Sequence, residues 1–304
     1  MKLSVSTLLT SLLFLTAISC SGNKPDFDGE SAFNYLVKQC DFGPRNPGSR
    51  GHENTFNYLL AEMKMFAESV RVQDFTHLDN ETGISYDLSN IIASFGVSAA
   101  KRVLIGAHWD TRPRSDRDKD PSKRNQPLLG ANDGASGVAV LMELAKVFSE
   151  NPPPIGVDLI LFDGEDFGEE GDLDNYFLGS RHFAKNFTGQ KPEWAVIIDM
   201  VGDANLEIPI ERYSFERNKR LVEMVWDAAD RAGATQFKRK LGSYIQDDHL
   251  MLYEHAGIEA INIIDFDYVR GGVNLWHTSL DTPEMCSPAS LTAVGKTLIE
   301  LIYE

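Results

Sequence analysis

The sequence is poor in cysteine, in basic residues and in long apolar runs. It has three cysteines in 304 residues, and two of them, Cys40 and Cys286, lack the close spacing of zinc–thiolate ligands. A zinc–thiolate site is therefore excluded, whereas one disulfide between them is left open, because the sequence does not give their distance. With 29 Lys and Arg against 45 Asp and Glu, the formal net charge is −16, which excludes a general binder of nucleic-acid phosphates.

The main apolar run lies at the N-terminus, from Leu3 to Ile18, and is too short to span a bilayer comfortably. It follows Lys2 and ends in small residues before Cys20, as in a bacterial lipobox, whose cysteine is acylated at its thiol and becomes the new amino terminus. We therefore expect residues 1–19 to be a lipoprotein signal peptide and residues 20–41 to be the lipidated cysteine and a tether. The chain would be an exported bacterial lipoprotein of the periplasm or cell envelope that contacts the membrane only through its lipid anchor. An ordinary signal peptide that contains a cysteine is the alternative.

Short apolar runs rich in β-branched residues alternate with helical patterns along the rest of the chain. The runs are apolar on both faces, as in buried strands, and cover residues 90–95, 102–107, 157–162, 195–198 and 260–264. Helical patterns cover residues 52–68, 137–149, 179–187, 215–232, 247–255 and 288–303, the last with Ser287 as N-cap and Pro288 at the first helical position. This alternation predicts one α/β domain over residues 42–304, with helices on both faces of a largely parallel sheet.

A highly polar stretch from Thr111 to Gly130 contains many charges of both signs, including Arg112, Arg117 and Asp118. Its length and composition predict a long loop. Because charge runs are usually solvated, we expect this loop to be solvent-exposed surface; a lid over a nearby site is the alternative.

Ionisable residues follow nearly every predicted strand, at the ends where open α/β sheets place their ligand crevices. One such residue is usually a capping or surface group, but several at strand ends of one type predict a common site. The clusters are His108-Trp109-Asp110, Asn132-Asp133-Gly134, Asp163-Gly164-Glu165-Asp166, Asp199-Met200 and Trp276-His277-Thr278.

Three of these residues, Asp133, Asp166 and His277, form a ligand set typical of a catalytic zinc ion, which binds carboxylate and imidazole and keeps one position open. Glu165 would then stand beside the metal, where a carboxylate can carry protons. Other chemistries fit less well, because the chain has no G-x-S-x-G nucleophile elbow, no Walker loop and no G-x-G-x-x-G fingerprint.

Taken in order, these clusters resemble the zinc aminopeptidase family that includes the glutaminyl-peptide cyclotransferases, from about Phe42 to the C-terminus. Four segments are specifically similar to the animal-type glutaminyl cyclases: Phe162-Asp163-Gly164-Glu165-Asp166, Leu178-Gly179-Ser180-Arg181-His182, Gln246-Asp247-Asp248-His249 and Trp276-His277-Thr278. The resemblance implies a single α/β/α domain of the zinc-exopeptidase type with a mixed twisted sheet, and one zinc ion. It also implies an acyltransferase that converts N-terminal glutamine of peptides and proteins to pyroglutamate and releases ammonia, with a monomer as the expected state.

The resemblance also assigns roles to residues. Asp133, Asp166 and His277 would bind the zinc ion. Glu165 would be the general acid and base, with Asp199 and Asp247 completing its carboxylate network. Trp276 would form an aromatic wall of the substrate pocket. His108 and Asp110 would orient the groups around the metal, or take part in a second metal site.

The chain departs from the animal enzymes at two places. Their second zinc ligand is usually Glu, and Asp166 is one methylene shorter. They also carry a pocket Trp shortly after the Glu-Glu pair, where this chain has Phe167-Gly168-Glu169-Glu170-Gly171. We expect Tyr176, Phe177 or Trp109 to replace that wall.

Two other functions stay open. A two-zinc aminopeptidase is the alternative, because His108, Asp133, Asp166, Asp199 and His277 occupy all five ligand positions of that family. The residues Gln246-Asp247-Asp248-His249 and Trp276 favour the cyclase. A lipid-tethered peptide-binding protein without activity is the third possibility. The presence of Glu165 together with a full ligand set argues against it.

Overall fold

The structure is a computed structural model that describes residues 24–304. The expected signal peptide and Cys20 lie outside these described residues. Within residues 24–304, no helix combines the length and the apolar character that a membrane span requires.

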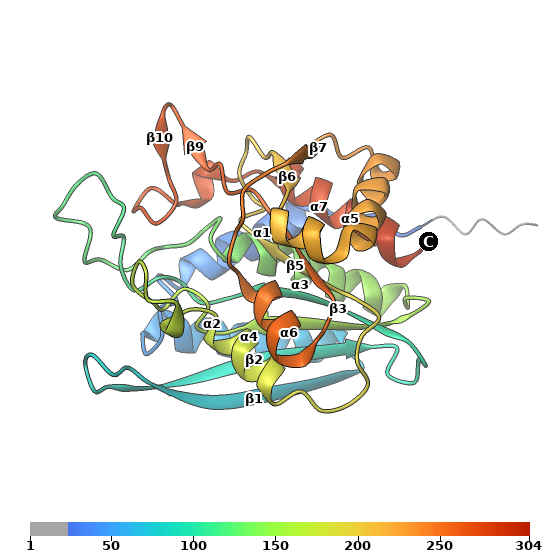
Figure 1. Ribbon diagram of the computed structural model, residues 1–304, viewed down its shortest axis with the longest axis horizontal. Coiled ribbons are helices and arrows are strands. Elements are labelled where there is room, and N and C mark those ends of the chain that lie inside the picture. Colours follow the sequence, from blue (N-terminus) through green and yellow to red (C-terminus); the bar gives the residue numbers. More distant parts are fainter. Residues whose placement is uncertain (1–23) are drawn as a thin grey trace, which may run out of the picture.

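A six-stranded sheet forms the centre of the domain, in the order β1-β2-β4-β3-β5-β8 (Figure 1). Its strands are β1 (Ser69–Leu78), β2 (Ser85–Phe95), β3 (Arg102–His108), β4 (Gly156–Phe162), β5 (Ala195–Asp199) and β8 (Ala260–Ile264). Strands β4, β3, β5 and β8 are mutually parallel, and β1 and β2 extend the sheet in antiparallel pairing. The predicted mixed, mostly parallel sheet is confirmed.

Helices cover both faces of this sheet, as predicted. One face carries α1 (Gly29–Asp41), α2 (Arg50–Phe66), α3 (Ala135–Glu150), α5 (Arg212–Ala232) and α7 (Pro288–Ile302). The other carries α4 (Leu178–Lys185) and α6 (Asp248–Ala256), which lie side by side (Figure 1). Burial on both sides explains why the interiors of the central strands are mostly apolar.

Helix α1 corrects the expected start of the domain. Asp28 caps it by accepting a hydrogen bond from the Ser31 amide, and its residues Ala32 and Leu36 are fully buried in the main core. The folded part therefore begins before residue 42, within the stretch expected to be a tether, because the apolar face of α1 contacts α3 and α7.

Several short or exposed elements complete the fold. They are β6 (Ile208–Ile210), β7 (Phe237–Leu241), β9 (Val269–Arg270), β10 (Val273–Asn274) and two 3₁₀ turns at Leu173–Asn175 and Pro283–Met285. Helix α7 begins as predicted, with the Ser287 side chain accepting from the Ser290 amide. Cys40 and Cys286 are both buried and are not joined by a disulfide.

Candidate active site

The parallel arrangement brings the polar strand ends together. His108 and Asp199 are the last residues of β3 and β5. Asp133 precedes α3, and Asp166 follows β4 in a short loop. His277 lies in the loop after β10. All five side chains are nearly buried and form two groups that share Asp133, one with Asp166 and His277, the other with His108 and Asp199.

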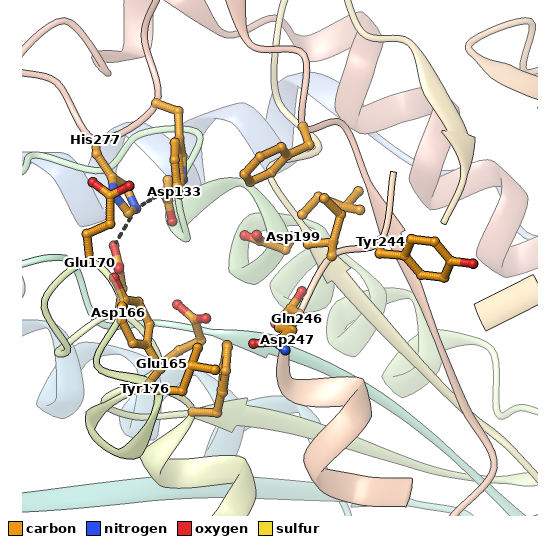
Figure 2. Close-up of a pocket in the computed structure, with 17 residues that line it drawn as sticks. Asp133, Glu165, Asp166, Glu170, Tyr176, Asp199, Tyr244, Gln246, Asp247 and His277 are labelled. Carbon is orange, nitrogen blue, oxygen red and sulfur yellow. Dashed lines mark ion pairs between the residues drawn. The ribbon is translucent and has the colours of Figure 1, made fainter. Parts of the chain in front are cut away.

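The group of Asp133, Asp166 and His277 has the spacing of metal ligands (Figure 2). His277 Nε2 lies 3.4 Å from Asp166 Oδ2 and 3.7 Å from Asp133 Oδ2. Bonds of about 2.0–2.2 Å place two tetrahedral zinc ligands roughly 3.3–3.6 Å apart. Asp166 Oδ2 is buried and has no hydrogen-bond partner among residues 24–304, so this donor set fits a divalent cation that would satisfy it.

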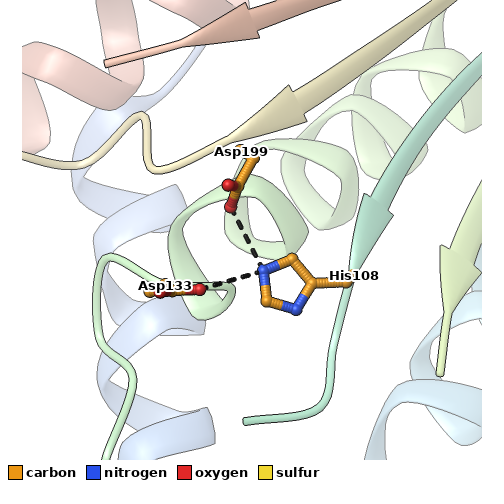
Figure 3. Close-up of side chains that lie close together, drawn as sticks. All are labelled: His108, Asp133 and Asp199. Atoms are coloured by element: carbon orange, nitrogen blue, oxygen red, sulfur yellow. Dashed lines mark hydrogen bonds and ion pairs between the residues drawn. The ribbon is translucent and has the colours of Figure 1, made fainter. Parts of the chain in front are cut away.

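The group of His108, Asp133 and Asp199 is tighter (Figure 3). His108 Nε2 lies 3.1 Å from Asp199 Oδ1, within hydrogen-bonding distance, and 3.2 Å from Asp133 Oδ1. Gly134 permits this approach, because a Cβ there would lie 2.5 Å from the His108 ring. The three side chains can therefore orient one another by hydrogen bonding or hold a second cation.

Glu165 and Asp199 are acids whose protons are held unusually tightly. Burial raises the pKa of Glu165 well above its usual value; His108 opposes this effect, and the charges of Asp166 and Asp247 add to it. Burial likewise raises the pKa of Asp199 to about 7, against the lowering effect of His108. Crowded carboxylates cannot all be ionised in a buried site, so the site retains a proton that can be transferred.

Asp247 lines the same pocket from the N-terminus of α6. Its Oδ1 caps the helix by accepting from the Asp248 amide at 2.5 Å, and its Oδ2 accepts from Asn262 Nδ2 at 2.6 Å. Asp248 is turned away and accepts from Ser180 Oγ at 2.5 Å. Asp247 is thus fixed beside the site by groups from α6 and β8.

Two further aspartates position the loops that carry the ligands. Asp110 accepts hydrogen bonds from the amides of Glu165 at 2.9 Å and Asp166 at 3.2 Å. Asp281 accepts from the amides of Asn132 and Asp133 at 2.8 and 3.1 Å. Asp110 belongs to the H-x-D cluster singled out above. The sequence analysis assigned no role to Asp281, although it follows His277 by four residues.

The expectation that Thr111–Gly130 is solvated surface is wrong for much of the loop. Arg112 is fully buried, and the Asp118 carboxylate accepts from the Ser279 amide. The Arg117 guanidinium lies 4.3 Å from the centroid of the Trp276 ring. The loop therefore packs against residues of the site, because several of its charges have partners there, and its exposed positions are Arg117 and most of residues 119–127.

Arg112 is a second site residue to which the sequence analysis assigned no role. Its Nη1 donates to Asp166 Oδ1 at 2.7 Å and to the Tyr176 hydroxyl at 2.8 Å, and its Nη2 donates to Asp116 Oδ2 at 2.6 Å. Burial acts to raise the pKa of Asp166, but His277 and Arg112 outweigh it and lower the pKa to about 2. Arg112 occupies one carboxylate oxygen of Asp166 and leaves the other facing His277.

A pocket of about 320 Å³ opens above these groups (Figure 2). Its walls include the aromatic residues Tyr176, Phe177, Phe266 and Trp276. Of the three candidates for the missing wall, Tyr176 and Phe177 line the pocket. Trp109 does not, because it is fully buried and stacks on His52 with ring centroids 4.4 Å apart. The pocket thus presents an acidic floor between aromatic sides.

Comparison with known proteins agrees with this geometry. A crystal structure of a glutaminyl cyclase from Bacteroides thetaiotaomicron superposes with a TM-score of 0.88, at 36% identity over 93% of this chain and 99% of that one. The crystal structure of a Zn-dependent exopeptidase from Parabacteroides distasonis also superposes with a TM-score of 0.88, at 38% identity over 92% of this chain and 99% of that one. The glutaminyl-peptide cyclotransferase-like protein of Bos taurus is 23% identical over 86% of this chain and 72% of its own.

These likenesses confirm the expected zinc-exopeptidase-like fold and the resemblance to the glutaminyl cyclases. Residues 90–302 match the model of peptidase family M28. The matched range includes the strand ends, both groups of candidate ligands and the aromatic pocket. The chain therefore belongs to peptidase family M28.

Proposed function

We propose that this chain is a zinc-dependent glutaminyl-peptide cyclotransferase, which converts an N-terminal glutamine to pyroglutamate with release of ammonia. The observation that carries the proposal is the position of Asp247. It adds a third carboxylate, beside Glu165 and Asp199, to a pocket whose candidate metal ligands are already complete. Both peptide hydrolysis and cyclisation require the α-amine of the substrate to be bound, but only cyclisation requires that amine to lose a proton and attack, which an additional carboxylate beside Glu165 and Asp199 favours.

In this proposal Asp133, Asp166 and His277 hold one zinc ion. When bound, the ion would polarise the oxygen of the substrate side-chain amide. The chain's own residues supply the proton transfers. Glu165 takes a proton from the attacking α-amine and delivers one to the amide nitrogen, which leaves as ammonia. The new bond joins the α-nitrogen to Cδ, the bond from Cδ to the side-chain nitrogen breaks, and no water is consumed.

The other residues orient the substrate and the carboxylates. Asp199 and Asp247 hold the α-amine between them, and His108 keeps Asp199 in place through their hydrogen bond. Asp110 fixes Glu165 and Asp166 through their amides. Trp276 forms the wall against which the glutamine side chain lies. Holding amine and amide in contact in this way supplies a large part of the acceleration of an intramolecular reaction.

A two-zinc aminopeptidase is the second candidate, and one observation favours it. The two candidate ligand groups share Asp133, which is the arrangement of a carboxylate that bridges two ions. In that case His108 and Asp199 would bind the second ion. We propose the single-ion site because Asp199 and His108 already satisfy each other by a hydrogen bond.

We also propose that the enzyme is a monomer, is exported as a lipoprotein through Cys20, and acts on peptides and proteins with N-terminal glutamine in the cell envelope. Labelling of intact cells with a radioactive fatty acid tests the anchor, and a Cys20→Ala variant is its control. Analytical ultracentrifugation of the soluble chain tests the oligomeric state.

The test of function is mass spectrometry of peptides that begin with Gln or Ala, with zinc per chain determined on the same sample. Loss of one ammonia from the Gln peptide alone, at one zinc ion, is the expected result. Release of the first residue from either peptide, at two zinc ions, would instead establish the aminopeptidase. A Glu165→Gln variant that retains zinc separates loss of chemistry from loss of metal.

A further inference from the structure

Tyr176 presents a hydroxyl group whose proton has no partner among the described residues. Its oxygen accepts a hydrogen bond from Arg112 Nη1 at 2.8 Å. An arginine side chain has donors only, so the Tyr176 proton cannot be donated to Arg112. None of residues 24–304 accepts a hydrogen bond from this hydroxyl, although Tyr176 lines the pocket. A polar proton is therefore left at the wall of the pocket, where an acceptor that enters from outside can meet it.

The local backbone holds Tyr176 at this place. The next residue, Phe177, has a left-handed backbone conformation with a φ of 58°, and its amide donates to the Glu165 carbonyl at 2.8 Å. Residues other than glycine adopt this conformation at a cost, and such residues collect at functional sites. Gly168 leaves room for the ring, because a Cβ there would lie 2.3 Å from Tyr176 Cδ2. The ring thus packs against the loop after β4, which also carries Glu165 and Asp166.

The hydroxyl lies beside the candidate metal group. Arg112 Nη1 donates to both Tyr176 Oη and Asp166 Oδ1, at 2.8 and 2.7 Å, so the two oxygens are neighbours. Glu165 and Asp166 lie on the same side of the pocket as Tyr176 (Figure 2). The proton of Tyr176 is therefore close to the place where the proposed reaction puts the side-chain amide of the substrate.

The pocket is rich in acceptors and poor in donors. Six carboxylates line it, namely Asp133, Glu165, Asp166, Glu170, Asp199 and Asp247. Ionised carboxylates only accept hydrogen bonds, so they suit the amine and the amide nitrogen of a substrate but not its amide oxygen. The hydroxyl of Tyr244, another lining residue, already donates to Glu216 at 2.5 Å. Tyr176 is thus a donor that is available to a substrate oxygen.

Arg112 makes the Tyr176 hydroxyl a better donor. A cation that donates to a hydroxyl oxygen polarises its O–H bond, and hydrogen bonds in such a chain strengthen one another. Because Arg112 is fully buried, solvent screens this effect little. A strengthened donor stabilises most an acceptor that gains negative charge.

We propose that the Tyr176 hydroxyl donates a hydrogen bond to the side-chain amide oxygen of the N-terminal glutamine and stabilises the negative charge that develops there during cyclisation. As the α-nitrogen bonds to Cδ, the π electrons of the carbonyl move onto this oxygen. They return when the bond from Cδ to the side-chain nitrogen breaks and ammonia leaves. Tyr176 keeps its own proton throughout, and Glu165 carries the transferred one. The inference rests on the proposed cyclase activity and adds a catalytic residue to it.

Tyr176→Phe is the diagnostic variant, because it removes the hydroxyl and keeps the ring. In ammonia release from a Gln peptide, its kcat should be about 10–100-fold lower, the effect of one hydrogen bond to a charged group, with KM nearly unchanged. Zinc per chain should equal that of the natural chain. Tyr244→Phe is the matched control, because Tyr244 lines the same pocket but its hydroxyl donates to Glu216, so its kcat should stay near that of the natural chain.

A binding measurement tests the same hydrogen bond without turnover. The ligand is a peptide whose first residue carries a sulfonamide in place of the side-chain amide. A sulfonamide is tetrahedral like the reacting carbon, has oxygen acceptors and does not cyclise. Titration calorimetry with the zinc-loaded protein should show a dissociation constant about tenfold higher for Tyr176→Phe than for the natural chain, and a much smaller change for Tyr244→Phe.

Three results would overturn the inference. An unchanged kcat in Tyr176→Phe would show that the hydroxyl takes no part in the reaction. A higher KM with kcat retained would show that it contacts another part of the bound substrate, and loss of zinc would show that it acts only through Arg112 and Asp166. Release of free amino acids without ammonia by the natural chain is a different result, because it would refute the cyclase itself and this inference with it.

Discussion

Replacing Arg112 by Met tests the buried ion pair that orients Asp166. Arg112 is fully buried and donates to Asp166, Asp116 and Tyr176, so its removal leaves the Asp166 carboxylate buried with only His277 nearby. Breaking a buried pair by removing one partner typically costs about 3–5 kcal/mol. We therefore expect the zinc-free variant to lose about that much free energy of unfolding.

Zinc should reduce this loss. A bound cation would compensate the charge of Asp166 when Arg112 is absent, so the variant should be less impaired with zinc than in a chelator. The assay is urea unfolding followed by circular dichroism, in both conditions. The free energy of unfolding of Arg112→Lys should lie between those of Arg112→Met and the natural chain. Lysine keeps the charge but cannot donate to three partners in the same planar geometry.

Arg239→Met is the matched control for this measurement. Arg239 pairs with Asp227 and Asp230 at 2.5 Å, but its side chain is 48% exposed. Exposed pairs contribute about 0–1 kcal/mol, so this variant should lose little. A buried ion pair between Arg112 and Asp166 is contradicted if Arg112→Met loses no more free energy of unfolding than Arg239→Met in zinc-free solution. It is also contradicted if zinc increases the loss in Arg112→Met.

Three further predictions concern catalysis, the metal and pH. Glu165→Gln should lower kcat by about 10²–10⁴ with zinc content unchanged, as measured by ammonia release and metal analysis; full activity would remove Glu165 from its role. A chelator should abolish ammonia release, and zinc at 100 times its dissociation constant should stabilise the fold by about 2.7 kcal/mol in urea unfolding; a chelator-resistant enzyme would contradict the metal site. Burial acts to raise the pKa of Glu211, but His249 and the amides of Ile245 and Ser214 outweigh it and lower this pKa from 4.5 to about 2. The ionised form is thus favoured by folding, so Glu211 contributes up to about 3 kcal/mol above pH 4.5 and loses it as the pH falls toward 2. The free energy of unfolding that Glu211→Gln loses relative to the natural chain should therefore shrink as the pH falls from 4.5 to about 2. A loss that does not change with pH would show that ionisation of Glu211 is not its cause.

The central layers of the fold could be predicted from the chain alone. Strands β3, β4, β5 and β8 are buried on both faces, so their apolar runs stand out, and the helices between them have clear apolar periodicity. Strand β1 could not be found in this way. It is an edge strand with half-exposed and polar positions, and its pairing with β2 supplies the missing stability.

The candidate ligands could be predicted for the same reason. Parallel strands end at one edge, so residues at the carboxyl ends of β3, β4 and β5 lie close together. Asp133 and His277 lie in loops, and the sequence analysis grouped them with Asp166 because the three residue types together form a ligand set typical of catalytic zinc. The structure brings all of them within the spacing of two ligand groups.

The role of the charged loop, in contrast, was decided only by the tertiary structure. Nothing in the composition of Thr111–Gly130 distinguishes Arg112, which is buried against Asp166, from Arg124, which is exposed. The sign of a charge does not specify a partner 54 residues away. The same holds for Phe266, whose contact with Trp276 depends on the path of the chain after β8. The sequence by itself thus determined the strands, the ligand types and their common edge, because these follow from local periodicity and strand direction. Which charges are buried, and which aromatic rings form the mouth, depended on long-range contacts that only the folded chain creates.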